Sequence, residues 1–145
     1  MDARKITDSY FVAPQIAVED IPALAEAGFT RIICNRPDEE VPPELQADAL
    51  RAAAEAAGLA FVLNPVSNAG MTPDNIALQQ DALATETGKT LAYCRSGTRS
   101  TFVWGLANAG VLAPETILTA AAEAGYDLSP IQPYLEAQSQ GDSGG

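Results

Sequence analysis

Short runs of hydrophobic residues alternate along the chain with longer segments in which hydrophobic residues recur at helical spacing. The short runs predict β-strands over 10–12, 29–34, 59–63 and 90–93. The longer segments predict helices over 18–27, 43–57, 72–87, 100–108, 114–124 and 130–137. Gly28 and Gly58 are suited to end a helix, and Thr72-Pro73 is suited to begin one. Strands separated by helices predict an α/β fold with a short, parallel-rich sheet flanked by helices.

The chain has 145 residues, enough for one domain with a buried core. We expect this domain over residues 1–138 and a disordered tail over 139–145, which are small and polar. No hydrophobic run approaches the roughly 20 residues that span a bilayer. The first residues also lack the apolar core of a secretory signal. We therefore expect a cytoplasmic protein that does not contact membranes.

The net charge and the residue content limit the partners and the reactions that we expect for this chain. The net charge of −11 argues against nucleic acid or an anionic membrane as partner, because such surfaces would be repelled. The two cysteines do not form a disulfide framework of the secreted kind. The chain has no histidine, which excludes a catalytic imidazole and a histidine-ligated metal. Any catalysis by a thiol must therefore rely on another means of activating it.

Cys94 follows a predicted strand and precedes a predicted helix, so it is the candidate nucleophile. Backbone N–H groups in such a turn form an anion-binding concavity, and the helix N-terminus adds partial positive charge. Arg99 is the main cationic partner of a thiolate or a bound oxyanion. Ser100 is placed so that its hydroxyl is expected to hydrogen-bond the sulfur. The residues expected to bind an anion are Arg95, Ser96, Gly97, Thr98, Arg99 and Ser100.

Two kinds of enzyme carry a loop that resembles this one, and they differ in the number of residues between the cysteine and the arginine. Phosphatases that form a cysteinyl-phosphate carry five residues between cysteine and arginine, whereas only four separate Cys94 from Arg99. The shorter spacing is similar to that of rhodanese-like sulfurtransferases, whose loops often read Cys-Arg-Ser-Gly-x-Arg-Ser. A shorter loop encloses less space, which favours a persulfide sulfur over a tetrahedral phosphoryl group.

From about residue 8 to residue 112 the chain resembles the phosphatase-like domain of bacterial beta-lactamase hydrolase-like proteins (DUF442). The matching stretches are Gly28-Phe29 through Ile32-Ile33, Asn35-Arg36-Pro37-Asp38, Gly58-Leu59 through Pro65-Val66, and Tyr93 through Ser100. The resemblance implies a dual-specificity-phosphatase-like fold, and members of the family are described both as sulfurtransferases and as phosphatases. It also suggests an association with a metallo-β-lactamase-like enzyme.

Two departures from the phosphatase pattern favour sulfur chemistry. Tyr93 stands where those phosphatases commonly carry a histidine. The loop Val66–Gly70, where a general-acid aspartate is expected, contains no carboxylate. Cleavage of a phosphate ester needs an acid for the leaving oxygen, whereas sulfur transfer between thiolates does not. Asp38 is the remaining candidate acid.

Several other residues have two interpretations. Arg36 either binds substrate or forms a salt-bridged turn with Asp38 that shapes the rim. Cys34 is either a resolving thiol for Cys94 or a small core residue. The Glu39-Glu40 pair predicts a solvated turn, and Trp104 is expected in the core.

The leading hypothesis is a cysteine-dependent sulfurtransferase that moves sulfur from a small anionic donor, such as thiosulfate, to a thiol acceptor. The alternative is a phosphatase that forms a phosphoenzyme at Cys94, and the third is a redox or anion sensor built on Cys94 and Cys34. None of these requires a metal or an organic cofactor. The sequence leaves the oligomeric state open.

Overall fold

A five-stranded sheet in the order β1-β2-β5-β3-β4 forms the centre of the computed structural model, which describes residues 3–67, 71–85 and 88–144. The strands are β1 Arg4–Lys5, β2 Tyr10–Ala13, β3 Phe29–Cys34, β4 Ala60–Leu63 and β5 Lys89–Tyr93. All neighbouring strands are parallel except β1, which is antiparallel to β2. The predicted parallel-rich α/β fold is confirmed. Strand β1 was not predicted, because its two exposed residues carry no hydrophobic pattern.

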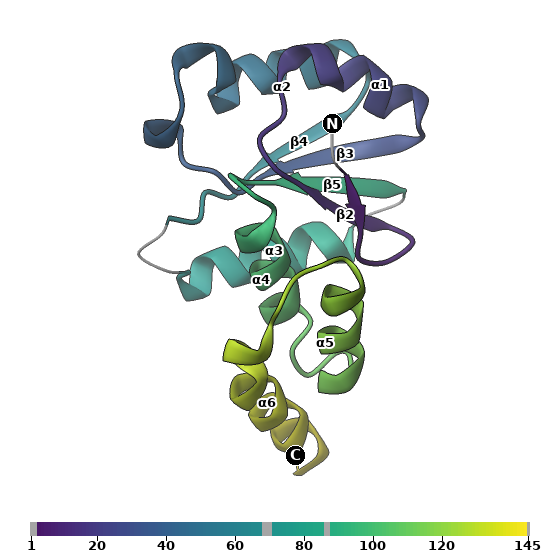
Figure 1. Ribbon diagram of the computed structural model, residues 1–145, viewed down its shortest axis with the longest axis vertical. Helices are drawn as coiled ribbons and strands as arrows, with labels where there is room; N and C mark the ends of the chain where they lie inside the picture. The colour runs from purple at the N-terminus through teal and green to yellow at the C-terminus, as the bar shows by residue number, and fades with distance from the viewer. Residues whose placement is uncertain (1–2, 68–70, 86–87, 145) are drawn as a thin grey trace.

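Helices cover both faces of the sheet (Figure 1). Helices α1 (Ile21–Glu26) and α2 (Ala47–Ala56) lie on one face, and α3 (Pro73–Ala84) and α4 (Thr98–Ala107) lie on the other. Helices α5 (Pro114–Glu123) and α6 (Gln132–Gly144) extend the molecule beyond α4, away from the sheet. Short 3-10 turns lie at Val18–Asp20, Asp38–Glu40, Pro43–Leu45 and Ser129–Ile131.

Several helix ends differ from the prediction; α2, for example, begins at Ala47 and not at residue 43, because a 3-10 turn occupies Pro43–Leu45. Helix α6 continues to Gly144, so the backbone is helical over most of the segment 139–145 that the sequence predicts to be disordered. Ala137 and Gln138 are good helix formers, and no proline follows them to interrupt the helix. Helix α3 ends at Ala84, and residues 86–87 of its predicted span lie outside the described residues.

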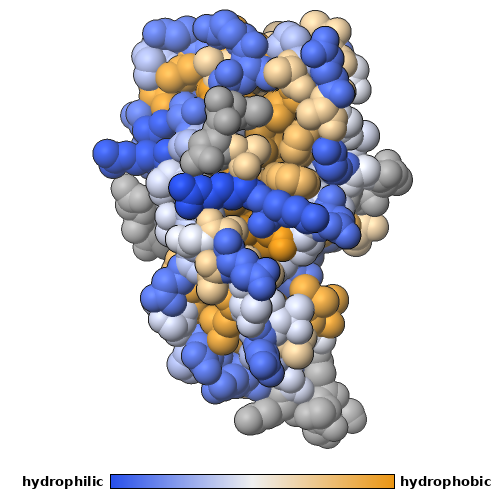
Figure 2. All heavy atoms as spheres, turned by 45° about the vertical axis from the view of Figure 1, so that its right-hand side comes forward, coloured by the Kyte–Doolittle hydropathy of each residue, from blue (hydrophilic) through white to orange (hydrophobic). Residues whose placement is uncertain are grey.

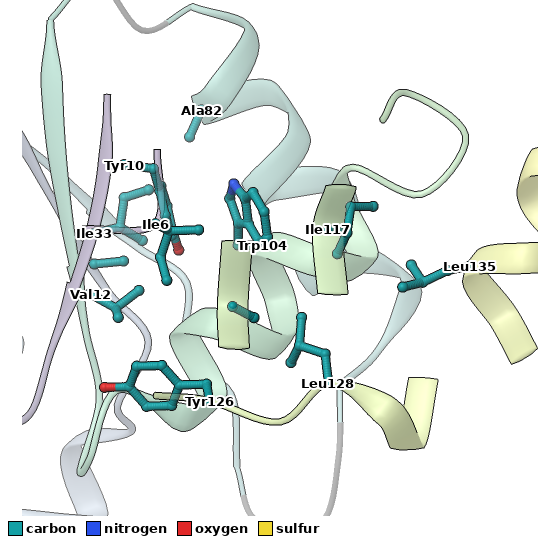
Figure 3. Close-up of a cluster of buried hydrophobic side chains, with 12 residues drawn as sticks. Ile6, Tyr10, Val12, Ile33, Ala82, Trp104, Ile117, Tyr126, Leu128 and Leu135 are labelled. Atoms are coloured by element: carbon teal, nitrogen blue, oxygen red, sulfur yellow. The ribbon is translucent and has the colours of Figure 1, made fainter. Parts of the chain in front are cut away.

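The alternation of side chains along the strands divides the core into two layers. On β3, Ile32 packs on the side of α1 and α2, whereas its neighbour Ile33 packs on the side of α4. Trp104 of α4 lies between Tyr10 and Ile117 (Figure 3). Its ring is stacked on that of Tyr10, with centroids 6.1 Å apart, and only 2% of the residue is exposed. The prediction that Trp104 belongs to the core is confirmed.

Hydrophobic residues also reach the surface, as separate areas between hydrophilic side chains on the face seen in Figure 2. The large exposed hydrophobic side chains are Val18, Leu78, Val111 and Tyr134, which come from separate segments of the chain. Within the described part of the chain, no helix combines the length and apolar character needed to cross a bilayer.

The parallel strands bring their carboxyl ends to one edge of the sheet, which is where ligands bind in such sheets. Hydrogen bonds continue past the ends of the strands. The Asn35 N–H donates to the Tyr93 carbonyl (2.9 Å), and the Asn64 N–H donates to the Cys34 carbonyl (2.9 Å). The Cys94 N–H donates to the Ala13 carbonyl at 3.3 Å. The segments that follow β2, β3, β4 and β5 are therefore fixed together at this edge.

Candidate active site

Cys94 lies at the base of the loop that joins β5 to α4, and it is fully buried. The Gly97 N–H donates to the Cys94 sulfur, with 3.1 Å between N and Sγ. Helix α4 begins at Thr98, so its N-terminal end lies beside the same loop. A backbone N–H and a helix N-terminus both favour negative charge on the sulfur or on a group bound to it. The structure thus gives Cys94 the surroundings of a thiolate nucleophile.

Gly97 occupies a position that other residues do not tolerate. Its φ of 90° is left-handed, and a Cβ built on it would lie 2.3 Å from the Tyr126 hydroxyl oxygen. The Gly97 carbonyl accepts a hydrogen bond from the Thr101 hydroxyl at 2.8 Å. The turn is therefore held by α4, and a side chain at residue 97 would displace Tyr126.

Arg99 is held by Glu40 on one side and remains available on the other. Its Nη1 and Nη2 donate to Glu40 Oε2 (3.0 Å) and Oε1 (2.8 Å), and Nη1 also donates to the Val66 carbonyl. The Glu40 hydrogen bond raises the pKa of Arg99, and the nearby Cys94 sulfur raises this pKa further. Within the described part of the chain, the Nε–H has no oxygen or nitrogen acceptor. This side of the guanidinium can bind an oxyanion held at Cys94.

Glu40 connects two arginines, so the prediction of a solvated turn is wrong for this residue. Besides Arg99, its Oε1 accepts from Arg36 Nε at 3.1 Å, and the Glu40 side chain is only 22% exposed. The hydrogen bond from Arg99 lowers the pKa of Glu40, and Arg36 lowers it further. Arg36 also donates to Gln15 Oε1 at 3.2 Å. Arg36 therefore supports the turn through Glu40 and not through Asp38 as expected, and its predicted role in binding substrate stays a prediction.

The Glu40→Gln substitution is expected to lower stability in a pH-dependent way. The folded-state pKa of Glu40 is depressed, so the stabilisation of the fold by its ionised carboxylate is fully present above the unfolded-state pKa of roughly 4.3. It is lost as the pH falls through the folded-state pKa. Chemical denaturation should show Glu40→Gln to be less stable than the unmodified chain by about 1 kcal/mol at neutral pH. The difference should shrink below about pH 4, and a pH-independent difference would contradict the ionic role.

Ser100 does not contact the Cys94 sulfur, contrary to expectation. Its hydroxyl donates to Asn35 Oδ1 at 2.9 Å, because that amide oxygen belongs to a buried polar network beside the loop. Asn35 Nδ2 donates to the Asn64 carbonyl at 2.9 Å and to Gln79 Oε1 at 3.3 Å. The Gln79 amide donates to the Tyr10 hydroxyl, which donates to the Ser100 carbonyl; both distances are 2.9 Å. The network therefore joins the start of α4 to the strands.

Asp38 and Cys34 each have a local partner. Asp38 Oδ1 accepts from the Ala47 N–H at 2.8 Å, at the start of α2, and the residue is exposed. This bond ties the Asp38 carboxylate to the N-terminal end of α2, as the bond of a helix cap does. The Cys34 thiol donates to the Arg36 carbonyl at 3.3 Å, and burial raises its pKa. A thiol with a raised pKa is a poor nucleophile at neutral pH. The roles of Asp38 as acid and Cys34 as resolving thiol stay predictions.

The remaining loop residues lie at the surface of the site. Arg95, Ser96 and Thr98 are exposed, and the Ser96 hydroxyl donates to that of Thr98 at 2.9 Å. A hollow of about 390 Å³ lies nearby; its lining residues are Pro37, Asp38, Glu39, Leu63, Pro65, Ser67, Thr72 and Asn75. Two of these, Glu39 and Ser67, are chain neighbours of the residues that bind Arg99. Among the described residues, no three Cys, Asp or Glu side chains are grouped to hold a metal ion.

Comparison with known proteins identifies the family. The model of the phosphatase-like domain of beta-lactamase hydrolase-like proteins matches residues 2–111. The beta-lactamase hydrolase-like protein of Agrobacterium fabrum is 33% identical over 141 residues, which are 96% of this chain and 33% of that protein. The chain belongs to the beta-lactamase hydrolase-like phosphatase-like domain family. It spans about one third of the length of the curated relatives that it matches.

Solved structures place this domain among cysteine phosphatases by fold. A candidate phosphatase from Neisseria meningitidis is 27% identical, with a TM-score of 0.78 over 93% of this chain and 96% of that chain. The kinase associated phosphatase, solved with its catalytic cysteine replaced by serine, is 16% identical, with a TM-score of 0.68 over 94% of this chain and 88% of that chain. At this identity the second likeness concerns the fold alone. The predicted cysteine-phosphatase-like fold is confirmed.

Sequence reasoning missed Glu40, Gln15 and Tyr126 as parts of the site. Glu40 carried a usable signal, since a carboxylate four residues after Arg36 in a strand-end loop can pair with it. Gln15 and Tyr126 carried none, because their contacts join segments far apart in the sequence.

Proposed function

We propose that this chain is a cysteine-dependent phosphatase that cleaves a phosphomonoester through a cysteinyl-phosphate intermediate. The observation that carries the proposal is the pair of groups around Cys94. The Gly97 N–H points at the sulfur, and Glu40 holds Arg99 so that its Nε side is left for an oxyanion. The phosphatase-like fold of the family supports the same reaction.

In the first step, the Cys94 thiolate attacks phosphorus and forms an S–P bond. The P–O bond to the leaving group breaks, and its electron pair departs with the oxygen. Arg99 and the loop N–H groups bind the non-bridging oxygens and stabilise their charge in the transition state. In the second step, water attacks phosphorus and the S–P bond breaks. Inorganic phosphate leaves, and the Cys94 thiolate is restored.

Among the described residues around Cys94, an acid that would protonate the leaving oxygen is not apparent. Asp38 caps α2, and residues 64–73 contain no carboxylate. We therefore propose that the leaving group departs as an anion and takes its proton from water. Esters of acidic alcohols, such as aryl phosphates, should then be the best substrates, since their oxyanions are stable without an acid.

Phosphate release from a series of aryl phosphates of decreasing phenol acidity tests this proposal. We expect the kcat/KM value to fall steeply along the series, with Asp38→Asn following the same line as the unmodified chain. No release from any member of the series by the folded chain would contradict the phosphatase. A flat series that becomes steep in Asp38→Asn would instead make Asp38 the acid.

Sulfur transfer is the second candidate, and the loop of only four residues between Cys94 and Arg99 favours it. In this reaction the Cys94 thiolate attacks the outer sulfur of a donor such as thiosulfate. The S–S bond breaks, sulfite leaves, and Cys94 carries a persulfide. A thiol acceptor, or cyanide in an assay, then attacks the outer sulfur and restores the thiolate. No acid is needed at either step, which agrees with the position of Asp38 at α2.

A further inference from the structure

We propose that Tyr126 is a positioning residue that aims the Gly97 N–H at the Cys94 sulfur. Tyr126 follows α5, at a distance of 30 residues along the chain from Ser96, and its hydroxyl donates to the Ser96 carbonyl at 3.0 Å. It lies beyond residues 2–111, which match the family model. The inference rests on Cys94 as the reacting thiol and holds for phosphoryl or sulfur transfer.

The peptide unit that joins Ser96 to Gly97 links Tyr126 to the Cys94 sulfur. The carbonyl of this unit accepts the Tyr126 hydrogen bond, and its N–H donates to Cys94 Sγ at 3.1 Å. The C=O and N–H of a planar trans peptide point in opposite directions. A donor that fixes the carbonyl on the outside of the loop therefore fixes the N–H on the inside. Hydrogen bonding at the carbonyl also polarises the peptide and strengthens its N–H as a donor.

Tyr126 is itself held in place on several sides. Its ring belongs to the core cluster shared by α4, α5 and the sheet, and its hydroxyl points away from Leu128 (Figure 3). The Arg4 guanidinium lies 5.5 Å from the ring centroid and donates to the Ala124 carbonyl at 3.1 Å. The hydroxyl oxygen occupies the space where a Cβ of residue 97 would stand. The phenol is thus a fixed support, and Gly97 leaves room for it.

The Tyr126→Phe variant tests the role because it removes the hydroxyl and keeps the ring. Alkylation of Cys94 by iodoacetamide is followed by mass spectrometry of the Cys94 peptide at about pH 6.5 and about pH 9, on either side of the range where a free thiol ionises. We expect Tyr126→Phe to react about threefold to tenfold more slowly than the unmodified chain at the lower pH, and equally fast at the higher pH. The slower reaction reflects a thiolate that has lost part of its stabilisation.

The matched control is Tyr134→Phe, which removes the hydroxyl of a 41% exposed tyrosine on α6. It should react like the unmodified chain at both pH values. Equal rates for Tyr126→Phe and the unmodified chain at the lower pH would overturn the inference. An equal change at both pH values would also overturn it, because it would reflect altered access to the buried sulfur. Neither result bears on whether the chain releases phosphate, so the two proposals fail separately.

Discussion

Replacing Cys94 with serine is expected to reduce turnover of an aryl phosphate by at least about 10⁴-fold, since the reaction loses its nucleophile. Serine keeps the size of the side chain, but its hydroxyl ionises far less readily than a thiol. The Gly97 N–H and the helix N-terminus beside the loop do not compensate for this. The variant should still fold and bind inorganic phosphate, because the groups that bind the anion remain in place. Phosphate release and phosphate binding are the two measurements.

Cys34→Ser is the matched control for this experiment, because Cys34 is also a buried cysteine at the end of a strand. We expect it to keep most of the activity, since the Cys34 thiol donates to a local carbonyl and burial raises its pKa. Substantial turnover by Cys94→Ser would contradict the assignment of the nucleophile. If neither substrate type is turned over and mild oxidation reversibly links Cys34 to Cys94, the sensor hypothesis is preferred.

Replacing Arg99 with lysine is expected to lower the kcat value by about 10²- to 10³-fold, although the charge is retained. An ammonium group cannot donate to both oxygens of Glu40 and still present a second, fixed side to the substrate. The interaction that is lost is strongest in the transition state, so kcat should fall more than KM rises. Steady-state kinetics with one aryl phosphate measures both quantities.

Arg95→Lys is the control for the lysine substitution. Arg95 lies in the same loop but is exposed, so we expect a change in kcat of less than about tenfold. Equal losses for the two variants would mean that general positive charge matters, and not the side of Arg99 that Glu40 leaves available. Retention of kcat in Arg99→Lys would exclude a transition-state role for Arg99.

The elements that set the fold could be predicted because their signals are local. Hydrophobic runs such as Phe29–Cys34 and helix starts such as Thr72-Pro73 depend on neighbours in the chain, and the structure has both where they were predicted. Cys94 at the end of β5 and before α4 follows from the same signals. The two-residue strand β1 could not be predicted in this way, because its pairing with β2 is a tertiary contact.

The partners of the site residues could not be predicted from local patterns. Ser100 was expected to contact Cys94, but the Asn35 amide competes successfully for its hydroxyl. Glu40 has the composition of a surface turn, and only the folded chain brings Arg99 to it. Tyr126 is a more extreme case, since its contact with the loop depends on the path of α5. Tertiary hydrogen bonds of this kind leave no periodicity in the sequence.

The curated relatives are longer than this domain, since the chain spans about one third of their length. An association between this domain and a metallo-β-lactamase-like enzyme remains the expectation that the resemblance suggested. The chemistry at Cys94 can be tested on this chain without it.

The most direct test of the central claim is the mass of the chain after brief reaction with an aryl phosphate and acid quenching, compared with the mass after reaction with thiosulfate. Rapid acid denaturation stops the hydrolysis of the S–P bond by the folded chain, so that the group can be located on the Cys94 peptide. We predict a gain of one phosphoryl group on Cys94 from the aryl phosphate, absent in Cys94→Ser. A gain of one sulfur atom from thiosulfate, with no phosphoryl adduct and with thiocyanate formed on adding cyanide, would contradict the phosphatase and establish sulfur transfer.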